Sequence, residues 1–341
     1  MCPKDNHLSN PDLSSPLQVG RISFRNRVVL APMSGVTDLP FRQLAWRYGA
    51  GLVVTEMVAS RELVGNAAES WARLRNSGIR PHMVQLAGRE AQWMAQAARI
   101  AADNGADVID INMGCPAKKV TGGYSGSALM RDPDHALSLI EATVKAVDIP
   151  VTLKMRLGWD ETSINAPLIA RRAQEAGVQL ITVHGRTRMQ FYTGRADWDA
   201  IRAVRDVISV PLIANGDVAT RADALDILNR SGADAVMIGR SSQGRPWHSG
   251  VLAGAICHPE VSEIQEIVAE HYGMMLEFYG EAAGLRHARK HIGWYLDRFA
   301  AHLPPAEKAA ILTSTDADSV QSRTRAAIAA GAGFAEQKDA A

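Results

Sequence analysis

Cysteine is scarce in this chain. Its 341 residues include only Cys2, Cys115 and Cys257, which lie far apart in the sequence. Three scattered cysteines cannot build the disulfide framework of a small secreted domain, and none of them belongs to a Cys-x-x-Cys metal-binding pair. We therefore expect no metal site, and we expect the protein to work in a reducing compartment.

Long hydrophobic runs are also absent. No apolar stretch approaches the roughly 20 residues that a membrane span requires. Residues 1–16 are polar and lack the apolar segment of a signal peptide. Hydrophobic residues make up 47% of the chain, which is ordinary for a globular protein. Together these features predict a cytoplasmic protein without membrane contact.

An excess of charge of one sign is missing as well. The 37 Lys and Arg residues nearly balance the 36 Asp and Glu residues, which gives a net charge of +1. The composition therefore does not indicate a strongly basic nucleic-acid binder. It does not exclude nucleic-acid binding either, because phosphate contacts require only a local basic patch.

Eight short apolar runs alternate with longer amphipathic segments. Each run ends at Gly, Pro, Asn or a charged residue, as expected of parallel strands buried on both faces. The runs cover residues 28–32, 51–56, 82–86, 107–112, 150–155, 180–184, 211–215 and 234–239. Helical periodicity covers residues 39–48, 90–104, 134–147, 163–176, 198–207 and 221–229. The count of eight and the polar strand ends favour a (β/α)8 TIM barrel over a doubly wound sheet.

The pattern changes after Gly254. Residues 262–299 and 305–330 show helical periodicity, and no further strand is evident. We predict a barrel domain over residues 1–257 and a small helical domain over residues 258–341, with a frayed end at 335–341.

The fourth run leads into Asn112-Met-Gly-Cys-Pro116 and then into a Gly-rich loop at residues 121–127. A buried strand that delivers one cysteine into a glycine-rich loop is typical of a reactive site. Cys115 is therefore the candidate catalytic residue. The alternative is an inert, buried side chain, which is the common state of a free cysteine.

Polar residues lie at the C-terminal ends of the other predicted strands. Burying all of them without a ligand would leave many polar groups unpaired. Gln and Asn suit a planar heterocycle, and Lys and His suit a ring that takes negative charge on reduction. The seventh and eighth strand ends, Asn215-Gly-Asp217 and Gly239-Arg240, lie where barrels commonly bind phosphate. A planar ring with one phosphate predicts FMN as the cofactor.

With these features the chain resembles the flavin-dependent tRNA-dihydrouridine synthases, most closely the bacterial B-type branch (DusB). The resemblance spans about residues 16–300. It rests on the segments 31–38, 112–116 with 118–120, 154–156, 183–188, 215–217, 237–240 and 289–295. One small departure is Ser34, where many members have Ala.

The resemblance implies reduction of the C5=C6 bond of uridines in tRNA to 5,6-dihydrouridine, with NADPH or NADH as the reductant. It implies that hydride passes from the reduced flavin to C6 and that Cys115 gives a proton to C5. Together with the strand-end inventory, it assigns the FMN site to Pro32, Met33, Ser34, Gln85, Asn112, Lys154, His184, Asn215, Gly216, Asp217, Gly239 and Arg240.

The resemblance also implies that tRNA is the partner. The predicted contacts with tRNA are Lys118, Lys119, Arg186, Arg188, Arg286, Arg289 and Lys290. Lys154, Arg186 and Arg188 are the candidates for stabilising charge on the uracil carbonyl, and the sequence does not choose among them. We expect a monomer without a protein partner. No local motif encodes which uridine is modified.

Two other functions remain open on the residues alone. One is a flavin enzyme acting on a free pyrimidine, similar to dihydroorotate dehydrogenase. The helical C-terminal segment with its basic run and the Lys118-Lys119 pair argue against it. The other is a non-catalytic RNA-binding protein, which the joint presence of Cys115, Lys154 and His184 disfavours.

Overall fold

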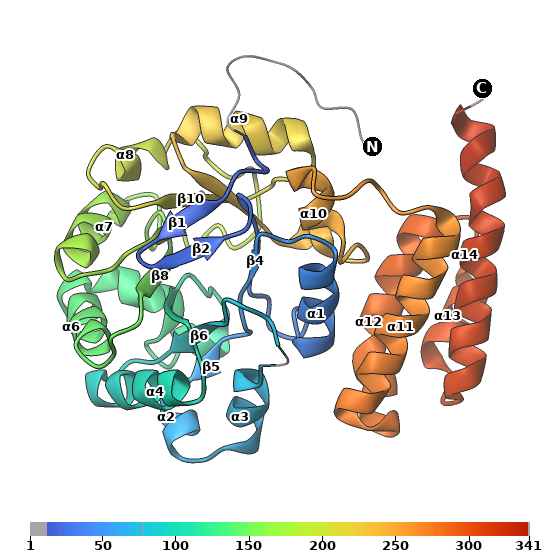
Figure 1. Ribbon diagram of the computed structural model, residues 1–341, viewed down its shortest axis with the longest axis horizontal. Coiled ribbons are helices and arrows are strands. Elements are labelled where there is room, and N and C mark those ends of the chain that lie inside the picture. Colours follow the sequence, from blue (N-terminus) through green and yellow to red (C-terminus); the bar gives the residue numbers. More distant parts are fainter. Residues whose placement is uncertain (1–11, 77, 340–341) are drawn as a thin grey trace.

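The computed structural model describes residues 12–76 and 78–339 (Figure 1). Its main element is a parallel sheet in the order β4-β3-β11-β10-β9-β8-β7-β6-β5. The strands are β3 (Val28–Leu30), β4 (Leu52–Val53), β5 (Val58–Ala59), β6 (Met83–Ala87), β7 (Val108–Met113), β8 (Val151–Arg156), β9 (Ile181–His184), β10 (Leu212–Asn215) and β11 (Ala235–Ile238). The strands β4 and β5 are two halves of one barrel strand, and a bridge from Val54 to Met83 closes the ring. The predicted TIM barrel is confirmed.

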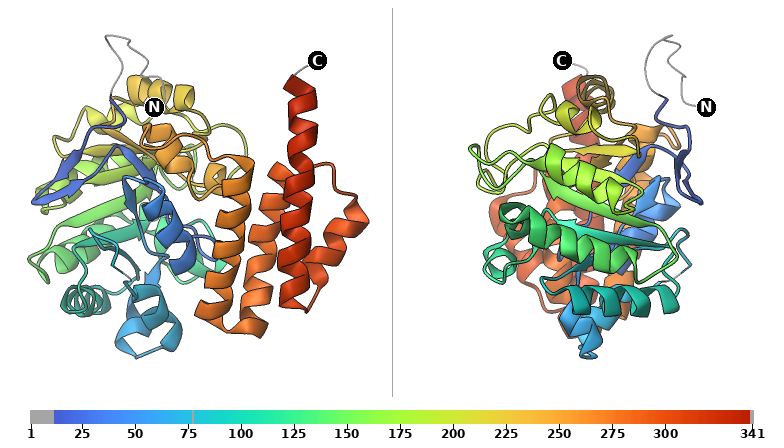
Figure 2. Two further views of the ribbon diagram at one scale, coloured as in Figure 1. Left: turned by 45° about the vertical axis from the view of Figure 1, so that its right-hand side comes forward. Right: turned by 90° about the vertical axis from the view of Figure 1, so that its left-hand side faces the viewer.

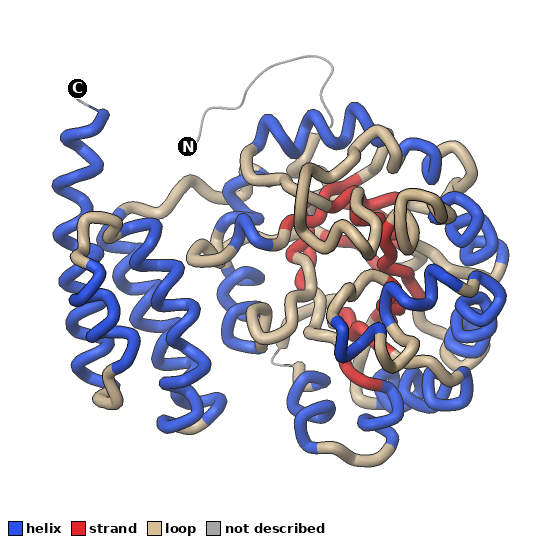
Figure 3. The backbone as a smooth tube through the Cα atoms, turned by 180° about the vertical axis from the view of Figure 1, so that it is seen from behind, coloured by secondary structure: helices blue, strands red, loops and turns tan. Residues whose placement is uncertain are grey.

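Helices surround this sheet, as Figure 3 shows from behind. The larger ones are α1 (Leu39–Arg47), α4 (Ala91–Asp103), α6 (Pro133–Val144), α7 (Ala166–Glu175) and α9 (Arg221–Ser231). Shorter ones are α2 (Ser60–Val64), α3 (Ala68–Leu74), α5 (Lys118–Thr121), α8 (Arg202–Arg205), α10 (His248–Ala253) and the 3-10 turns η1 (Gly126–Arg131) and η2 (Arg240–Ser242). The helix predicted over residues 198–207 is thus a single turn.

The predicted helix starts are confirmed at three caps. The side chains of Asp38, Asp132 and Thr220 accept hydrogen bonds from backbone N–H groups in the first turns of α1, α6 and α9. Such caps satisfy donors that the helix itself leaves unpaired. They fix where each helix leaves its preceding loop, and these loops carry the site described below.

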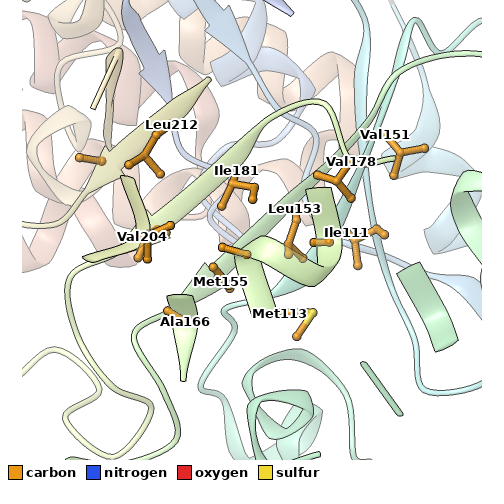
Figure 4. Close-up of a cluster of buried hydrophobic side chains, with 14 of the residues drawn as sticks. Ile111, Met113, Val151, Leu153, Met155, Ala166, Val178, Ile181, Val204 and Leu212 are labelled. Atoms are coloured by element: carbon orange, nitrogen blue, oxygen red, sulfur yellow. The ribbon is translucent and has the colours of Figure 1, made fainter. Parts of the chain in front are cut away.

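Side chains alternate between the two faces of each strand. On β7, Ile109, Ile111 and Met113 pack outward into the main hydrophobic cluster between sheet and helices, which Figure 4 shows with Leu153, Met155 and Ile181. Inward, Val108 joins an apolar cluster inside the barrel, and Asp110 and Asn112 are buried polar residues. Because a barrel interior is filled by layers of side chains, the interior changes from apolar to polar along the strands.

An antiparallel hairpin, β1 (Leu17–Val19) and β2 (Ile22–Phe24), precedes the barrel and was not predicted from the sequence. Its Leu17, Val19 and Phe24 belong to the apolar cluster inside the barrel. The partners of these residues include Val29 and Val108, which lie near the beginnings of their strands. The hairpin therefore closes the amino-terminal end of the barrel and leaves the opposite end for a ligand.

The C-terminal part is a bundle of helices that lies beside the barrel (Figure 2). They are α11 (Val261–Tyr279), α12 (Glu281–Phe299), α13 (Pro305–Thr313) and α14 (Ala317–Asp339). The periodic stretch 262–299 is two helices, because Gly280 adopts a positive φ of 75° that ends α11. The predicted domain boundary at 257 falls between α10 and α11, and the division into domains stays a prediction. The frayed end predicted over residues 335–341 stays a prediction; α14 extends to Asp339, and residues 340–341 lie outside the described residues.

Contacts between bundle and barrel centre on α1. Arg47 of α1 forms an ion pair of 2.6 Å with Glu270 of α11. The ring of Phe41 contacts His271 and His291 at centroid distances of 5.6 and 5.7 Å. Tyr279 donates a hydrogen bond of 3.0 Å to Asp38, the cap of α1. Within residues 12–76 and 78–339, no helix is long and apolar enough to cross a membrane.

Candidate functional site

A cavity of about 450 Å³ opens at the carboxyl ends of the strands. Its volume is in the usual range for a bound small molecule. The lining includes Cys115 and all twelve residues predicted for the cofactor, from the ends of β3, β6, β7, β8, β9, β10 and β11. The residues predicted from the sequence lie up to 208 positions apart in the chain (32 to 240), and the fold brings them together around one cavity.

The floor of the cavity contains two oriented amides. Asn112 donates from Nδ2 to Oε1 of Gln85 at 2.7 Å, and Gln85 donates from Nε2 to Oδ2 of Asp110 at 2.7 Å. Thr152 donates to the other oxygen of Asp110 at 2.6 Å. Burial raises the pKa of the Asp110 carboxyl, and its two hydrogen bonds and Lys154 act in the opposite direction. These hydrogen bonds thus fix the orientation of the Gln85 and Asn112 side-chain amides.

The loop that carries Cys115 is held on both sides. The carbonyl oxygen of the Asn112 side chain accepts from the backbone N–H groups of Gly114 and Cys115 at 3.2 and 3.0 Å. The carbonyl of Cys115 accepts from the backbone and hydroxyl of Ser127 at 3.1 and 2.9 Å. A Cβ at Gly126 would lie 2.9 Å from that carbonyl, so this close approach requires glycine. Cys115 is a free thiol that lines the cavity.

The thiol of Cys115 has a raised pKa, because its burial outweighs the opposite effects of a backbone hydrogen bond and of Arg156 and Lys154. An unperturbed thiol, with a pKa of about 8.5, is already mostly protonated at neutral pH. A raised pKa keeps it protonated more completely. This is the property of a proton donor, whereas an activated nucleophile would require a lowered pKa.

Two cations line the cavity next to the thiol. Lys154 donates to Oδ1 of Asn215 at 3.2 Å, and burial together with the charge of Arg156 lowers its pKa to about 8. Arg156 donates to the carbonyls of Gly114, Thr187 and Phe191 at 2.8 to 2.9 Å. It therefore ties the Cys115 loop to the loop after β9. The pair can stabilise negative charge that develops on a ligand.

His184 faces the cavity as a neutral ring. Its pKa lies well below the ordinary value, first because it is buried and then because Arg156, Lys154 and Arg186 are close. Its Nε2 lies 3.3 Å from Nη1 of Arg186. A guanidinium can only donate, so Nε2 accepts and Nδ1 carries the hydrogen. His184 can accordingly donate one hydrogen bond to a ligand.

The opposite end of the cavity suits an anion. Gly216 has a φ of 126°, and a Cβ there would lie 2.6 Å from Ala196, so only glycine fits. The neighbouring Asp217 pairs with Arg186 at 2.5 Å and with Arg240 at 3.0 Å. Burial alone would raise the pKa of Asp217, but these partners and the Ala196 N–H lower it. Asp217 thus holds Arg240 beside Gly239, where a phosphate can bind.

Sequence comparison identifies the family. The family model described as dihydrouridine synthase (Dus) matches residues 29–327. The chain belongs to the dihydrouridine synthase family. It is 76% identical over 311 residues to a "Probable tRNA-dihydrouridine synthase" of Rhizobium leguminosarum bv. phaseoli, covering 91% of this chain and 98% of the relative.

Two further relatives support this membership in the dihydrouridine synthase family. A "Probable tRNA-dihydrouridine synthase" of Rhodobacter capsulatus is 58% identical over 299 residues, covering 85% of this chain and 90% of the relative. A "tRNA-dihydrouridine synthase B" of Pseudomonas putida is 45% identical over 289 residues, covering 83% of this chain and 86% of the relative. The resemblance noted in the sequence is confirmed, including its relation to the B branch.

The other residues predicted for the site lie outside the cavity lining. Arg186 is buried and bonded to His184, Asp217 and two loop carbonyls, so it acts on the cavity through its neighbours. Arg188 is buried against the rings of Trp159 and Phe191 at 4.8 and 4.6 Å. Lys118 is exposed beside the Cys115 loop. The side chain of Lys119 lies outside the described residues.

The basic residues predicted on the bundle divide into two groups. Arg286 and Arg289 are exposed on α12. Lys290 is half-buried, and its Nζ lies 3.1 Å from where a Cβ on Gly35 would stand. Gly35 belongs to the loop after β3, next to Met33 and Ser34, which line the cavity. Lys290 therefore approaches the mouth of the cavity, whereas Arg286 and Arg289 face solvent.

Several cavity residues of this family member were missed from the sequence. Arg156 lies in the segment 154–156 that carries the resemblance but has no predicted role, and its position two residues after Lys154 on β8 is the signal that could have found it. Tyr192 is 51% exposed and has Arg240 over its ring at 4.9 Å. It lies in a loop without a periodic pattern. The lining also includes Ala31, Val36, Met57, Gly114, Pro116, Ala117, Phe191 and Gln243.

Proposed function

We propose that this protein is a tRNA-dihydrouridine synthase that reduces the C5=C6 bond of uridines in tRNA, with bound FMN and with NADPH or NADH as the reductant. The observation that carries the proposal is the placement of the Cys115 thiol beside two cations and two oriented amides in one cavity, where burial raises the pKa of the thiol. The names of the relatives supply the substrate, tRNA.

The residues of the cavity fit FMN in their chemistry. Gln85 and Asn112 present amide groups to a planar ring, and Lys154 and His184 present donors to a ring that gains negative charge. Gly216, Gly239 and Arg240 suit a phosphate monoester. Pro32, Met33 and Ser34 supply the loop after β3, and Asn215 and Asp217 orient Lys154 and Arg240. When bound, reduced FMN supplies the hydride that C6 of the uridine accepts.

The residues of the chain then complete the reduction. As C6 takes the hydride, negative charge builds toward C5 and the C4 carbonyl of the uracil. Cys115 gives its proton to C5, so that hydride and proton together saturate the double bond, and the thiolate regains a proton from solvent. Lys154 or Arg156 stabilises the charge on the carbonyl, because both cations line the cavity beside the thiol.

The tRNA reaches the cavity from the side of the bundle. Arg286 and Arg289 on α12 and Lys118 and Lys119 beside the Cys115 loop contact its phosphates, and Lys290 binds close to the flipped base. A base must leave its stack to enter such a cavity. The protein acts as a cytoplasmic monomer, in which residues 1–257 perform the chemistry and residues 258–341 hold the tRNA.

The proposal is tested on the purified protein. We expect a yellow protein whose flavin is reduced by NADPH and reoxidised by unmodified tRNA, with dihydrouridine as the product in nucleoside mass spectrometry. Free dihydroorotate is the matched alternative substrate. Turnover of dihydroorotate without any reaction on tRNA would overturn the proposal, as would a colourless protein that does not bind added FMN.

A further inference from the structure

We propose that Asp110 is a positioning residue for Cys115 and that it acts through a hydrogen-bond relay inside the barrel. The relay is visible in the fold itself, whereas its consequence for catalysis rests on the proposed function. Asp110 does not line the cavity, and the residue is 4% exposed. It therefore reaches the ligand only through other residues.

The strand β7 places Asp110 between two different layers. Val108, Asp110 and Asn112 alternate with the outward residues of the strand. Val108 belongs to the apolar cluster inside the barrel, and Asn112 lines the cavity. Asp110 is thus a carboxyl one layer below the cavity floor. Pairing in register sets it opposite Gln85 of β6 and Thr152 of β8, the two side chains that donate to it.

The relay connects this carboxyl to the backbone of the cysteine. It runs from the N–H of Cys115 to Oδ1 of Asn112 at 3.0 Å, from Nδ2 of Asn112 to Oε1 of Gln85 at 2.7 Å, and from Nε2 of Gln85 to Oδ2 of Asp110 at 2.7 Å. The N–H of Gly114 also donates a hydrogen bond to Oδ1 of Asn112 at 3.2 Å. All members except the loop residues are buried.

The chemistry of the two ends fixes the direction of the relay. The backbone N–H groups at the top can only donate, so Asn112 must turn its oxygen toward them. Its amide nitrogen then faces Gln85, and the nitrogen of Gln85 must face an acceptor. A carboxylate oxygen is such an acceptor, and Thr152 satisfies the second oxygen. An apolar residue at 110 would leave a buried N–H of Gln85 unpaired, which buried amides avoid.

This direction has a consequence for both the thiol and the ligand. The two backbone N–H groups occupy the oxygen of Asn112, so its second N–H is what Asn112 can offer to a ligand acceptor in the cavity. The same two bonds hold the turn at Gly114 and Cys115. If the relay loses its acceptor at 110, the amides can rotate, and the turn that presents the Cys115 thiol loosens.

The test measures the position of the thiol without relying on turnover. The rate at which iodoacetamide alkylates Cys115 in the full-length protein is followed by mass spectrometry of its peptide, across a range of pH. Asp110→Leu removes the acceptor at similar volume, and we expect alkylation to be at least about 5-fold faster, the factor expected from the loss of one hydrogen bond. Asp110→Asn keeps an acceptor for Gln85 and is expected to stay within about 2-fold of the unsubstituted protein.

Control variants separate the relay from general loosening of the core. Thr182→Val changes a buried residue inside the barrel on β9 that has no part in the relay, and it should leave the alkylation rate unchanged. Gln85→Met breaks the relay at its middle and should match Asp110→Leu. Combining both substitutions should add nothing, because members of one network are not additive. Gln85→Met also provides the answer if Asp110→Leu fails to fold.

The outcomes distinguish this proposal from the proposed function. A folded Asp110→Leu protein that is alkylated at the rate of the unsubstituted protein would overturn the role of Asp110, and so would equal changes for Leu and Asn at this position. Both results leave dihydrouridine synthesis by the unsubstituted protein untouched. Where that synthesis is observed, Asp110→Leu is expected to lower kcat by about 10-fold or more and to change KM for tRNA little, because a small misplacement of a reacting group is costly.

Discussion

At the scale of single residues, the proposed chemistry rests on Cys115. The thiol lines the cavity, and its pKa is raised by burial. We expect Cys115→Ala to keep the bound flavin and its reduction by NADPH, since these steps need no proton at C5 of the uracil. Dihydrouridine formation should fall by about 100-fold or more, the usual contribution of a general acid. Absorbance of the flavin and nucleoside mass spectrometry measure the two effects separately.

A matched variant in the same loop is Ser125→Ala. Ser125 lies in the Gly-rich loop, and its side chain is not among those that line the cavity. It should retain full dihydrouridine formation, which would exclude disturbance of the loop as the cause of the loss. Normal product formation by Cys115→Ala would instead remove Cys115 from the role of acid and require another donor.

Lys154 provides a prediction about pH. Burial and the charge of Arg156 lower its pKa to about 8, so the ammonium is charged below about pH 8 and loses its charge as the pH rises further. If this charge stabilises the uracil carbonyl, kcat/KM should fall above about pH 8. Lys154→Arg keeps the cation to higher pH than lysine does, because the ordinary pKa of a guanidinium is above about 12. Its profile should lack this decline.

The measurement is kcat/KM on tRNA between about pH 6 and pH 10. The decline near the pKa of Lys154 can be told from loss of the Cys115 proton, since the raised thiol pKa places that loss at higher pH. A decline that stays at the same pH in the Lys154→Arg protein would assign it to another group. Arg156 would then be the better candidate for the cation at the carbonyl.

At the scale of elements, the sequence predicted the strands better than the connections. Each of the eight predicted strands has continuous apolar residues bounded by polar or turn-forming ones. This local pattern can be recognised in the sequence without knowledge of the surrounding fold. The hairpin of β1 and β2 was missed because two strands of three residues each carry almost no periodicity. The break at Gly280 was missed because apolar spacing continues from α11 into α12.

The candidate site shows the same limit. Residues at strand ends were predictable, because parallel strands of a barrel bring their carboxyl ends together. The role of Arg186 as the partner of Asp217 was not predictable, because Asp217 is 31 positions away in the sequence and the two side chains meet only in the folded protein. Tyr192 and Phe191 were missed because they lie in a loop, where the sequence shows no period that could place them.

The helix α12 supports a prediction about tRNA. Arg286 and Arg289 are exposed on it, and phosphate contacts of this kind make affinity depend on salt. The double variant Arg286→Glu and Arg289→Glu should weaken tRNA binding by about 10-fold or more at about 100 mM salt and flatten its salt dependence. Flavin binding should not change. Lys290 is left intact, because its closeness to Gly35 could disturb the cavity.

A control with the same change of charge lies on the barrel. Lys145 and Arg171, near the C-terminal ends of α6 and α7, are exposed. Among the described residues their ion-pair partners are Glu141 and Glu175, one turn away. Lys145→Glu and Arg171→Glu alter the net charge equally. Binding of tRNA should then weaken little at moderate salt. Equal losses in the two double variants would show that net charge matters and that α12 is no specific contact.

At the scale of the whole molecule, barrel and bundle share a buried interface that contains histidines. The rings of His271 and His291 lie 4.8 Å apart and both contact Phe41 of α1. Burial lowers the pKa of His271 to about 3, and the pKa of His291 lies well below its ordinary value for the same reason, reinforced by His271, Lys290 and His287. Both ring nitrogens of His291 lack a hydrogen-bond partner among the described residues. The interface therefore requires neutral rings.

This requirement makes the folded state sensitive to acid. Because the folded-state pKa is depressed, the unfolded chain binds more protons below the unfolded pKa of about 6.5, and stability is lost as the pH falls through and below that value. Asp38, whose pKa is raised to about 6 by burial and by Glu56, acts in the opposite direction. The contribution of one histidine must therefore be isolated by comparing variants.

His291→Phe isolates it. The phenyl ring fills a similar space among aromatic neighbours and has no proton to bind. Between about pH 7.5 and pH 5.5 the unsubstituted protein should lose about 1.4 kcal/mol of unfolding free energy that the variant retains, the value of one pH unit below the unfolded pKa for one group. Phe41→Leu, in the same cluster, should lower stability equally at both pH values. Urea unfolding at the two pH values measures the difference in unfolding free energy. Equal losses of unfolding free energy in His291→Phe and in the unsubstituted protein would show that His291 is protonated in the folded interface. A partner absent from its present contacts would then have to stabilise that charge.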